Sequence, residues 1–106
     1  MQNTDPHTDA PFVVQADPVI KSLVPGYLDN RRKDLVTIEQ AVAAGDFKRL
    51  RKLGHDLKGS GGAYGMAPIS ALGNIIETAA LAADAGKIQE AARQLAAFLK
   101  RVVLPT

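Results

Sequence analysis

The chain has 106 residues and a formal net charge of +2, which is enough length for one domain with a single hydrophobic core. Cysteine and tryptophan are absent and aromatic residues make up 5% of the chain, which excludes disulfides and thiolate chemistry and disfavours stacking on nucleic-acid bases. No apolar run approaches the roughly 18 residues of a membrane span, and residues 1–10 lack the apolar core of a signal peptide, so we expect a cytoplasmic protein.

The first segment, residues 1–16, is predicted to be a flexible N-terminal tail, because it contains two prolines and no helical periodicity. A helix is expected to begin at Asp17 and Pro18, since aspartate is a good N-cap and proline suits the first helical position. Pro25 is expected to end this short helix or to begin a new one. The folded domain is therefore predicted to cover residues 17–106.

Four further segments have apolar residues at the spacing of amphipathic helices. They cover approximately residues 25–44, 47–57 or beyond, 68–85 and 87–103. Gly45 and Gly86 are expected to end helices, and the short links that result favour antiparallel neighbours. No segment alternates with the period of two that is typical of a strand. The predicted fold is all-α, an antiparallel up-and-down four-helix bundle with a short additional N-terminal helix.

The positive charge is concentrated in one short segment, residues 46–62. Five basic and two acidic side chains lie there, whereas the rest of the chain has a slight acidic excess. The basic residues are Lys48, Arg49, Arg51, Lys52 and Lys58. Such a charge run is most often a solvated helix face, but it can also dock an acidic protein or a phosphate group. Charge alone leaves both interpretations open.

His55 is the candidate functional residue of this segment, because on a helix that begins at Phe47 it points away from the apolar stripe. The stripe consists of Leu50, Leu53, Leu57 and Tyr64, and the face around the histidine carries Lys48, Arg51, Lys52, Lys58, Gly59 and Gly62. A glycine inside a helix costs about 1 kcal/mol relative to alanine. The glycines therefore either end the helix or leave space for another protein to approach the imidazole.

Several kinds of chemistry do not fit the surroundings of His55. A helical metal ligand needs a second ligand three or four residues away, and those positions hold Arg51, Lys52, Lys58 and Gly59. Ser60 and Asp56 point in other directions on the helical wheel, so a serine hydrolase triad is not expected. What remains is the histidine as a nucleophile, because neutral imidazole is available near pH 7. Lys58, one turn further on, is placed to neutralise a phosphoryl group.

The stretch HDLKGSGGAYG, residues 55–65, resembles the signature of histidine-containing phosphotransfer (HPt) domains, which is His-x-Leu-Lys-Gly-Ser with a second glycine six residues after the first. The Arg31–Arg32 pair and residues 44–47 and 72–77 are also similar to the family, so the resemblance covers approximately residues 17–103. It implies a four-helix bundle that carries phosphoryl groups between the aspartates of receiver domains in two-component signalling and has no kinase activity of its own. The implied partners are the receiver domains of response regulators and a hybrid histidine kinase.

The resemblance also implies roles for individual residues. His55 would accept the phosphoryl group through Nε2, Lys58 would stabilise it, and Gly65 would shape the following turn. Leu57 and Ser60 belong to the structural motif. The expected partner contacts are Lys48, Arg51, Lys52, Gly59, Gly62 and Met66, because the cation-rich face complements an acidic partner pocket. Leu23 and Tyr27 are further apolar candidates. No metal or cofactor is expected on this chain, and the receiver is expected to supply a divalent metal ion.

One position departs from the family pattern. Some members carry a glutamine directly after the second glycine, where it contacts the imidazole or the phosphate, whereas this chain has Met66. Phosphate stabilisation is therefore expected to depend more on Lys58 or on the partner.

Two alternative functions stay open. The first is a nucleic-acid-binding module that uses the basic residues, and its affinity would fall steeply with salt. The second is a docking adaptor that is never phosphorylated. The absence of a long apolar heptad repeat favours a monomer in each case.

Overall fold

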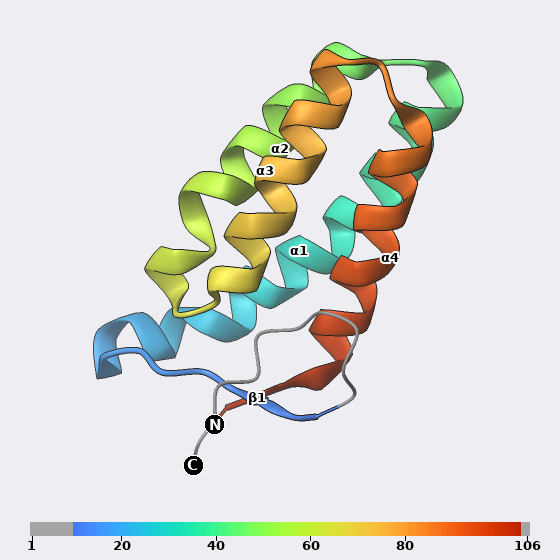
Figure 1. Ribbon diagram of the computed structural model, residues 1–106. Helices are drawn as coiled ribbons and strands as arrows, with labels where there is room; N and C mark the ends of the chain where they lie inside the picture. Colours follow the sequence, from blue (N-terminus) through green and yellow to red (C-terminus); the bar gives the residue numbers. More distant parts are fainter. Residues whose placement is uncertain (1–9, 105–106) are drawn as a thin grey trace.

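The computed structural model describes residues 10–104, which form four helices, one 3-10 turn and two very short strands (Figure 1). The helices are α1 (Pro18–Ala44), α2 (Phe47–Ser60), α3 (Ala67–Leu81) and α4 (Ala85–Arg101). The 3-10 turn (Gly62–Tyr64) follows α2, and the strands are β1 (Phe12–Val13) and β2 (Val102–Val103). Consecutive helices run in alternating directions, and α2 and α3 lie side by side (Figure 1). The predicted all-helical architecture with four helices is confirmed.

α1 is one continuous helix, so the prediction of a separate short N-terminal helix is wrong. The helix begins as predicted, with Pro18 in its first turn and the Asp17 side chain accepting the N–H of Ile20 at 3.0 Å. Pro25 lies inside the helix, where a missing N–H and steric conflict cost about 3 kcal/mol. Burial of a large apolar side chain contributes about 1.5–3 kcal/mol, so packing around the proline keeps the two parts in one helix. The buried neighbours are Val24, Tyr27 and Leu28.

The link between α3 and α4 differs from the prediction that Gly86 ends a helix. α3 ends at Leu81, and Gly86 lies in the first turn of α4. Ala83 turns the chain with a left-handed φ of 53°, and the Asp84 side chain accepts the N–H of Lys87 at 3.1 Å. Asp84 is thus the N-cap of α4, and its capping bond outweighs the weaker stop signal of the glycine.

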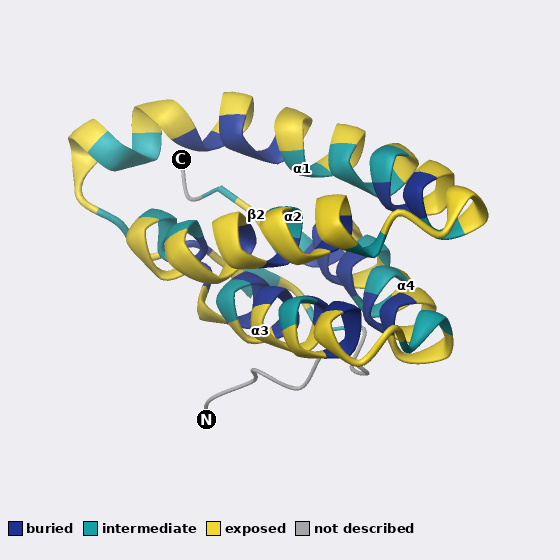
Figure 2. Ribbon diagram, turned by 90° about the horizontal axis from the view of Figure 1, so that it is seen from above, coloured by how far each residue is buried: buried dark blue, intermediate teal, exposed yellow. Residues whose placement is uncertain are grey.

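Most of the core is formed by the inward faces of the four helices, which are dark blue in Figure 2, and Val14 and Met66 add to it from outside the helices. Its largest fully buried side chains are Phe98, Ile38, Leu50, Leu57, Met66, Ile69, Ile76, Ile88, Leu95, Val14 and Val24. No helix within residues 10–104 has both the length and the apolar character needed to cross a bilayer.

Two residues predicted to contact a partner protein lie in this core. Met66 is completely buried and Tyr27 is only 6% exposed, so their prediction as contact residues is wrong. Met66 directly precedes α3, and its flexible thioether side chain fills core space where the chain turns. Leu23, the third apolar candidate, is 51% exposed.

Part of the predicted N-terminal tail is packed on the bundle. β1 pairs in parallel with β2, Val14 donates its N–H to the carbonyl oxygen of Val103 at 3.1 Å, and the Val14 side chain is fully buried. Arg101 Nε donates to the carbonyl oxygen of Ala10 at 2.7 Å. The packed domain therefore extends beyond the predicted boundary at residue 17. Residues 1–9 of the predicted tail lie outside the described residues.

Candidate functional site

His55 lies on the outer face of α2, where its side chain is 70% exposed. The helix is capped by Asp46, whose side chain accepts the N–H of Arg49 at 3.1 Å. Its opposite face is anchored in the core by Leu50 and Leu57. The predicted orientation of the histidine, away from the apolar stripe, is therefore confirmed.

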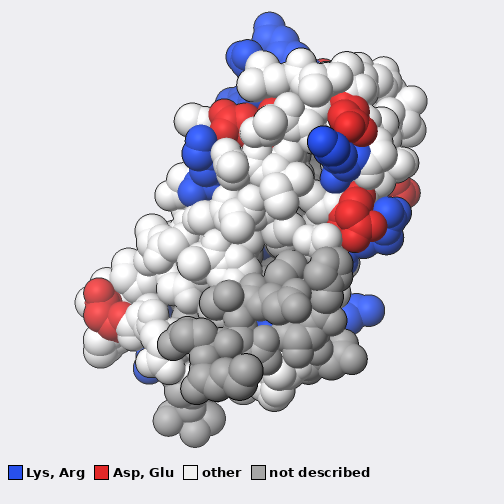
Figure 3. Space-filling model, viewed as in Figure 1, with Lys and Arg blue, Asp and Glu red and all other residues white. Residues whose placement is uncertain are grey.

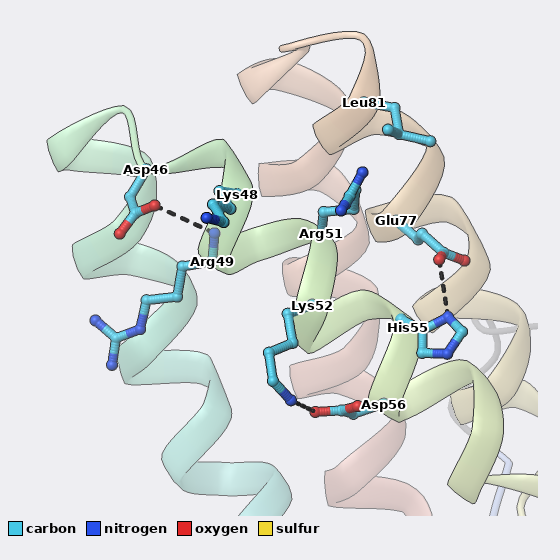
Figure 4. A pocket seen from close by; sticks show the side chains of 9 residues that line it. All are labelled: Asp46, Lys48, Arg49, Arg51, Lys52, His55, Asp56, Glu77 and Leu81. Carbon is cyan, nitrogen blue, oxygen red and sulfur yellow. Dashed lines mark hydrogen bonds and ion pairs between the residues drawn. The ribbon is translucent and has the colours of Figure 1, made fainter.

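The imidazole contacts Glu77 of α3, a residue to which the sequence motifs assigned no role. His55 Nδ1 and Glu77 Oε2 are 2.9 Å apart (Figure 4). Lys58 Nζ donates to the other carboxylate oxygen, Oε1, at 3.4 Å. Because an ionised carboxylate can only accept hydrogen bonds, this contact favours the neutral tautomer that carries its proton on Nδ1, in which the lone pair is on Nε2. In that tautomer Nε2 is the ring nitrogen that can accept a hydrogen bond or act as a nucleophile.

The contacts with His55 and Lys58 also favour the ionised form of Glu77. The hydrogen bond with His55 lowers the pKa of the Glu77 carboxyl below the ordinary value for glutamate, and Lys58 adds to this effect, whereas partial burial opposes it. Glu77 is therefore a carboxylate at neutral pH and can hold the imidazole in one orientation and one tautomer. It is also the single charged residue in the sequence of α3, which is a signal that could have identified it.

His55 lines an open groove between α2 and α3 that encloses about 800 Å³ (Figure 4). Its lining residues are Asp46, Lys48, Arg49, Arg51, Lys52, His55, Asp56, Glu77 and Leu81. Three of the predicted partner contacts thus share one surface with the histidine: Lys48, Arg51 and Lys52. Gly59 and Gly62 do not line the groove and lie at and beyond the end of α2.

Charge is distributed unevenly around the histidine. On the α2 side, Lys52 pairs with Asp56 at 3.0 Å, and because both side chains are well exposed the pair adds little stability. The outward side of α3 is uncharged, and the middle of the face in Figure 3 is correspondingly white. Its exposed residues include Ala71, Asn74, Ile75 and Thr78. In the described part of the chain, no group of three or more His, Cys, Asp or Glu side chains could hold a metal ion.

The glycines after the histidine have different structural roles. α2 continues beyond Gly59, and a Cβ added at this position would meet nothing within 4 Å, so Gly59 borders open space. Gly61 caps the helix, and a Cβ added there would lie 2.5 Å from the backbone nitrogen of Ser70. The N–H of Gly62 donates to Ser70 Oγ at 2.8 Å. Gly65 has a φ of +79°, a left-handed conformation that favours glycine.

Ser60 of the motif connects the end of α2 to α1. Its Oγ lies 2.8 Å from the Tyr27 hydroxyl oxygen. The Tyr27 ring stacks on Tyr64, with ring centroids 4.0 Å apart, and the Arg31 guanidinium lies 4.4 Å from the Tyr27 centroid. This cluster fixes the end of the helix that carries His55.

Tyr27→Phe is expected to lower the free energy of unfolding by about 1 kcal/mol, because it removes the hydroxyl contact and keeps the ring stacking. Ser60→Ala should have a similar effect, and the double variant should cost less than the sum of the two, since both changes remove one shared bond. Chemical denaturation followed by circular dichroism measures all three. Strict additivity would show that the two hydroxyls do not interact.

A family model of the Hpt domain matches residues 23–103, which is most of the chain. The chain therefore belongs to the Hpt domain family. Hpt domains act in histidine phosphotransfer in two-component and phosphorelay signalling, where they work with response-regulator receiver domains and histidine kinases. They are phosphotransfer carriers and not kinases. No curated protein and no solved structure matches the chain significantly.

Proposed function

We propose that this chain accepts a phosphoryl group on His55 from the aspartate of one receiver domain and passes it to the aspartate of another. The proposal is carried by the geometry of the imidazole. Glu77 binds Nδ1 at 2.9 Å, so Nε2 is left as a nucleophile on a ring that is 70% exposed. Lys58, one helical turn further along α2, supplies a positive charge beside it.

The transfer chemistry follows from this geometry. The Nε2 lone pair attacks the phosphorus of an aspartyl phosphate, the bond between phosphorus and the carboxylate oxygen breaks, and the aspartate leaves as a carboxylate. The Nδ1 proton stays on the ring, which becomes positively charged, and the Glu77 carboxylate stabilises that charge. In the onward step, an aspartate of the next receiver attacks the phosphorus in line. The nitrogen–phosphorus bond then breaks, and its electron pair returns to Nε2.

Lys58 is proposed to stabilise the transferred group. Its contact with Glu77 is long, at 3.4 Å, and its side chain is half exposed, so the ammonium group can turn toward a phosphoryl oxygen. We assign the divalent metal ion to the acidic pocket of the receiver. The carboxylate beside His55 already binds both the imidazole and Lys58, and the chain offers a cationic surface there.

The receiver is proposed to dock over α2 as one molecule on a monomeric chain. Basic side chains of the groove complement an acidic receiver pocket, and the open space at Gly59 lets the partner's backbone approach the imidazole. Three acidic residues line the same groove, which makes a nucleic-acid surface the weaker interpretation. The proposed contacts are Lys48, Arg51, Lys52, Gly59 and Gly62.

Reversing the charge of the groove should slow association with the receiver. Lys48→Glu/Arg51→Glu is expected to lower the association rate constant about tenfold at low salt, because electrostatic steering is lost. The difference should shrink as salt rises. The control Lys33→Glu/Lys100→Glu makes the same change in net charge at exposed positions that do not line the groove. Stopped-flow binding at several ionic strengths measures both variants, and equal slowing would argue against docking at the groove.

The direct test of the function is transfer of a radiolabelled phosphoryl group from a phosphorylated receiver domain to this chain at alkaline pH, where phosphohistidine survives. A label on the chain that is stable in base and labile in acid supports the proposal. Binding without any label, with several receivers tried, would instead support an adaptor that docks but is not phosphorylated.

A further inference from the structure

α2 and α3 touch through their backbones where Gly54 of α2 faces Gly73 of α3. Both glycines are buried. A Cβ added at Gly54 would lie 2.5 Å from the backbone nitrogen of Glu77 and 2.8 Å from the carbonyl oxygen of Gly73. A Cβ added at Gly73 would collide with the backbone nitrogen of Lys58 and lie 2.7 Å from the carbonyl oxygen of Gly54. This crossing therefore has no room for a single methyl group.

The crossing lies directly beneath the functional site. Gly54 immediately precedes His55, and its close contact on α3 is the backbone of Glu77. Gly73 makes its closest contact with the backbone of Lys58. The side chains that meet at the site belong to His55, Glu77 and Lys58. Each is thus attached to the backbone at the glycine contacts or at the residue next to them.

The separation of the helices decides whether Glu77 can reach the imidazole. Non-bonded heavy atoms come into contact at about 3.5 Å, so an alanine at position 54 would push α2 and α3 apart by about 1 Å. The bond of 2.9 Å between His55 Nδ1 and Glu77 Oε2 would then lengthen beyond hydrogen-bond distance unless a side chain moved to another rotamer. Glycine is also less favourable than alanine inside a helix, and a pair of facing glycines gains stability only through close approach.

We propose that Gly54 and Gly73 are positioning residues for phosphoryl transfer, because their backbone contact sets the helix spacing at which Glu77 holds the His55 imidazole and Lys58. The proposal rests on the proposed role of His55 as the phosphoryl acceptor. The proposed role does not extend to Gly26 and Gly59, because a Cβ at either position would meet nothing within 4 Å.

The test compares Gly54→Ala with Gly26→Ala, a control that adds the same methyl group inside α1 where space is open. Circular dichroism verifies the fold of both variants. The ¹⁵N chemical shifts of the two imidazole nitrogens report the tautomer of His55, and single-turnover assays report transfer from a phosphorylated receiver. We expect Gly54→Ala to shift the tautomer away from the Nδ1–H form and to slow transfer by about 10- to 100-fold. Gly26→Ala should leave both at wild-type values.

A double variant tests whether the glycine acts through Glu77. In a Glu77→Ala background, Gly54→Ala should cause no further slowing, because the contact that it disturbs is already absent. Equal slowing in both backgrounds would overturn the proposal. A folded Gly54→Ala protein with the wild-type tautomer and rate would overturn it as well.

Glu77→Asp provides a second variant that leaves the helix crossing untouched and serves if Gly54→Ala does not fold. It withdraws the carboxylate by one carbon–carbon bond and should likewise shift the tautomer and slow transfer. An unchanged tautomer in Glu77→Asp would overturn the proposal, since the site would then tolerate the change in spacing. The tautomer measurement needs no phosphoryl donor. It therefore tests the role of the glycines even if no receiver labels the chain and the proposed function is wrong.

Discussion

A His55→Gln variant is expected to take up no label from a phosphorylated receiver under conditions in which the wild-type chain is labelled. Glutamine keeps a polar side chain but has no nitrogen lone pair that can attack phosphorus. Loss of a nucleophile lowers such rates by at least about 1000-fold, so the label should fall below detection. Gel autoradiography after an alkaline quench measures the result.

The interpretation of this variant depends on an intact fold and intact docking. Because the His55 side chain is 70% exposed, its replacement should leave the unfolding free energy nearly unchanged. Affinity for the receiver, measured by titration calorimetry, should also stay within a few-fold of the wild type. A label of equal strength on His55→Gln would place the acceptor on another residue and remove the basis of the proposed mechanism.

The helices could be predicted from the sequence wherever local signals decide the structure. Asp17 with Pro18 begins α1, and Gly45 ends it with a φ of 67°. The prediction failed at Gly86, where the Asp84 cap begins the next helix, and at Pro25 and Met66, where tertiary packing decides. The cost of an interior proline is outweighed by buried neighbours, and the side chain that follows the last motif glycine enters the core.

The site was predictable to the extent that it lies on one helix. Helical periodicity places on one face His55, Lys58, Lys48, Arg51 and Lys52. The contact with Glu77 spans 22 residues of sequence and joins two helices, so the lone charge of α3 marks the residue but no local pattern pairs it with His55. The same holds for Gly54 and Gly73, whose importance depends on the backbone that each one meets across the crossing. The contacts between α2 and α3 are thus the features of the site that could be found only from the structure.

The pH dependence of stability should reveal the charge on Glu77. Its contacts with His55 and Lys58 lower the pKa of the carboxyl in the folded state. The resulting stability is fully present above the unfolded-state pKa of about 4.3 and is lost as the pH falls through the lower folded-state pKa. The difference in unfolding free energy between the wild type and Glu77→Gln should therefore persist down to about pH 5 and shrink below it. Denaturant unfolding at a series of pH values measures this difference, and a difference that grows in acid would contradict the lowered pKa.

Glu77→Ala is expected to slow phosphoryl transfer by about 10- to 100-fold without unfolding the chain. The variant removes the acceptor for Nδ1–H, so the imidazole loses its fixed orientation, and the positive charge that forms on the ring during transfer loses its counter-charge. Glu77→Gln keeps an acceptor oxygen without the charge and should slow transfer by only about 3- to 10-fold, because hydrogen bonds to charged groups are the stronger ones.

Single-turnover rates of the two variants separate orientation from charge. If orientation of the ring were the whole role of Glu77, glutamine would restore the wild-type rate; if charge were the whole role, glutamine and alanine would be equally slow. An intermediate rate for glutamine is expected, because the 2.9 Å contact supplies both effects to the same nitrogen. Wild-type rates in both variants would show that Glu77 of α3 does not contribute to the reaction of His55. The reactivity of Nε2 would then depend on the receiver alone.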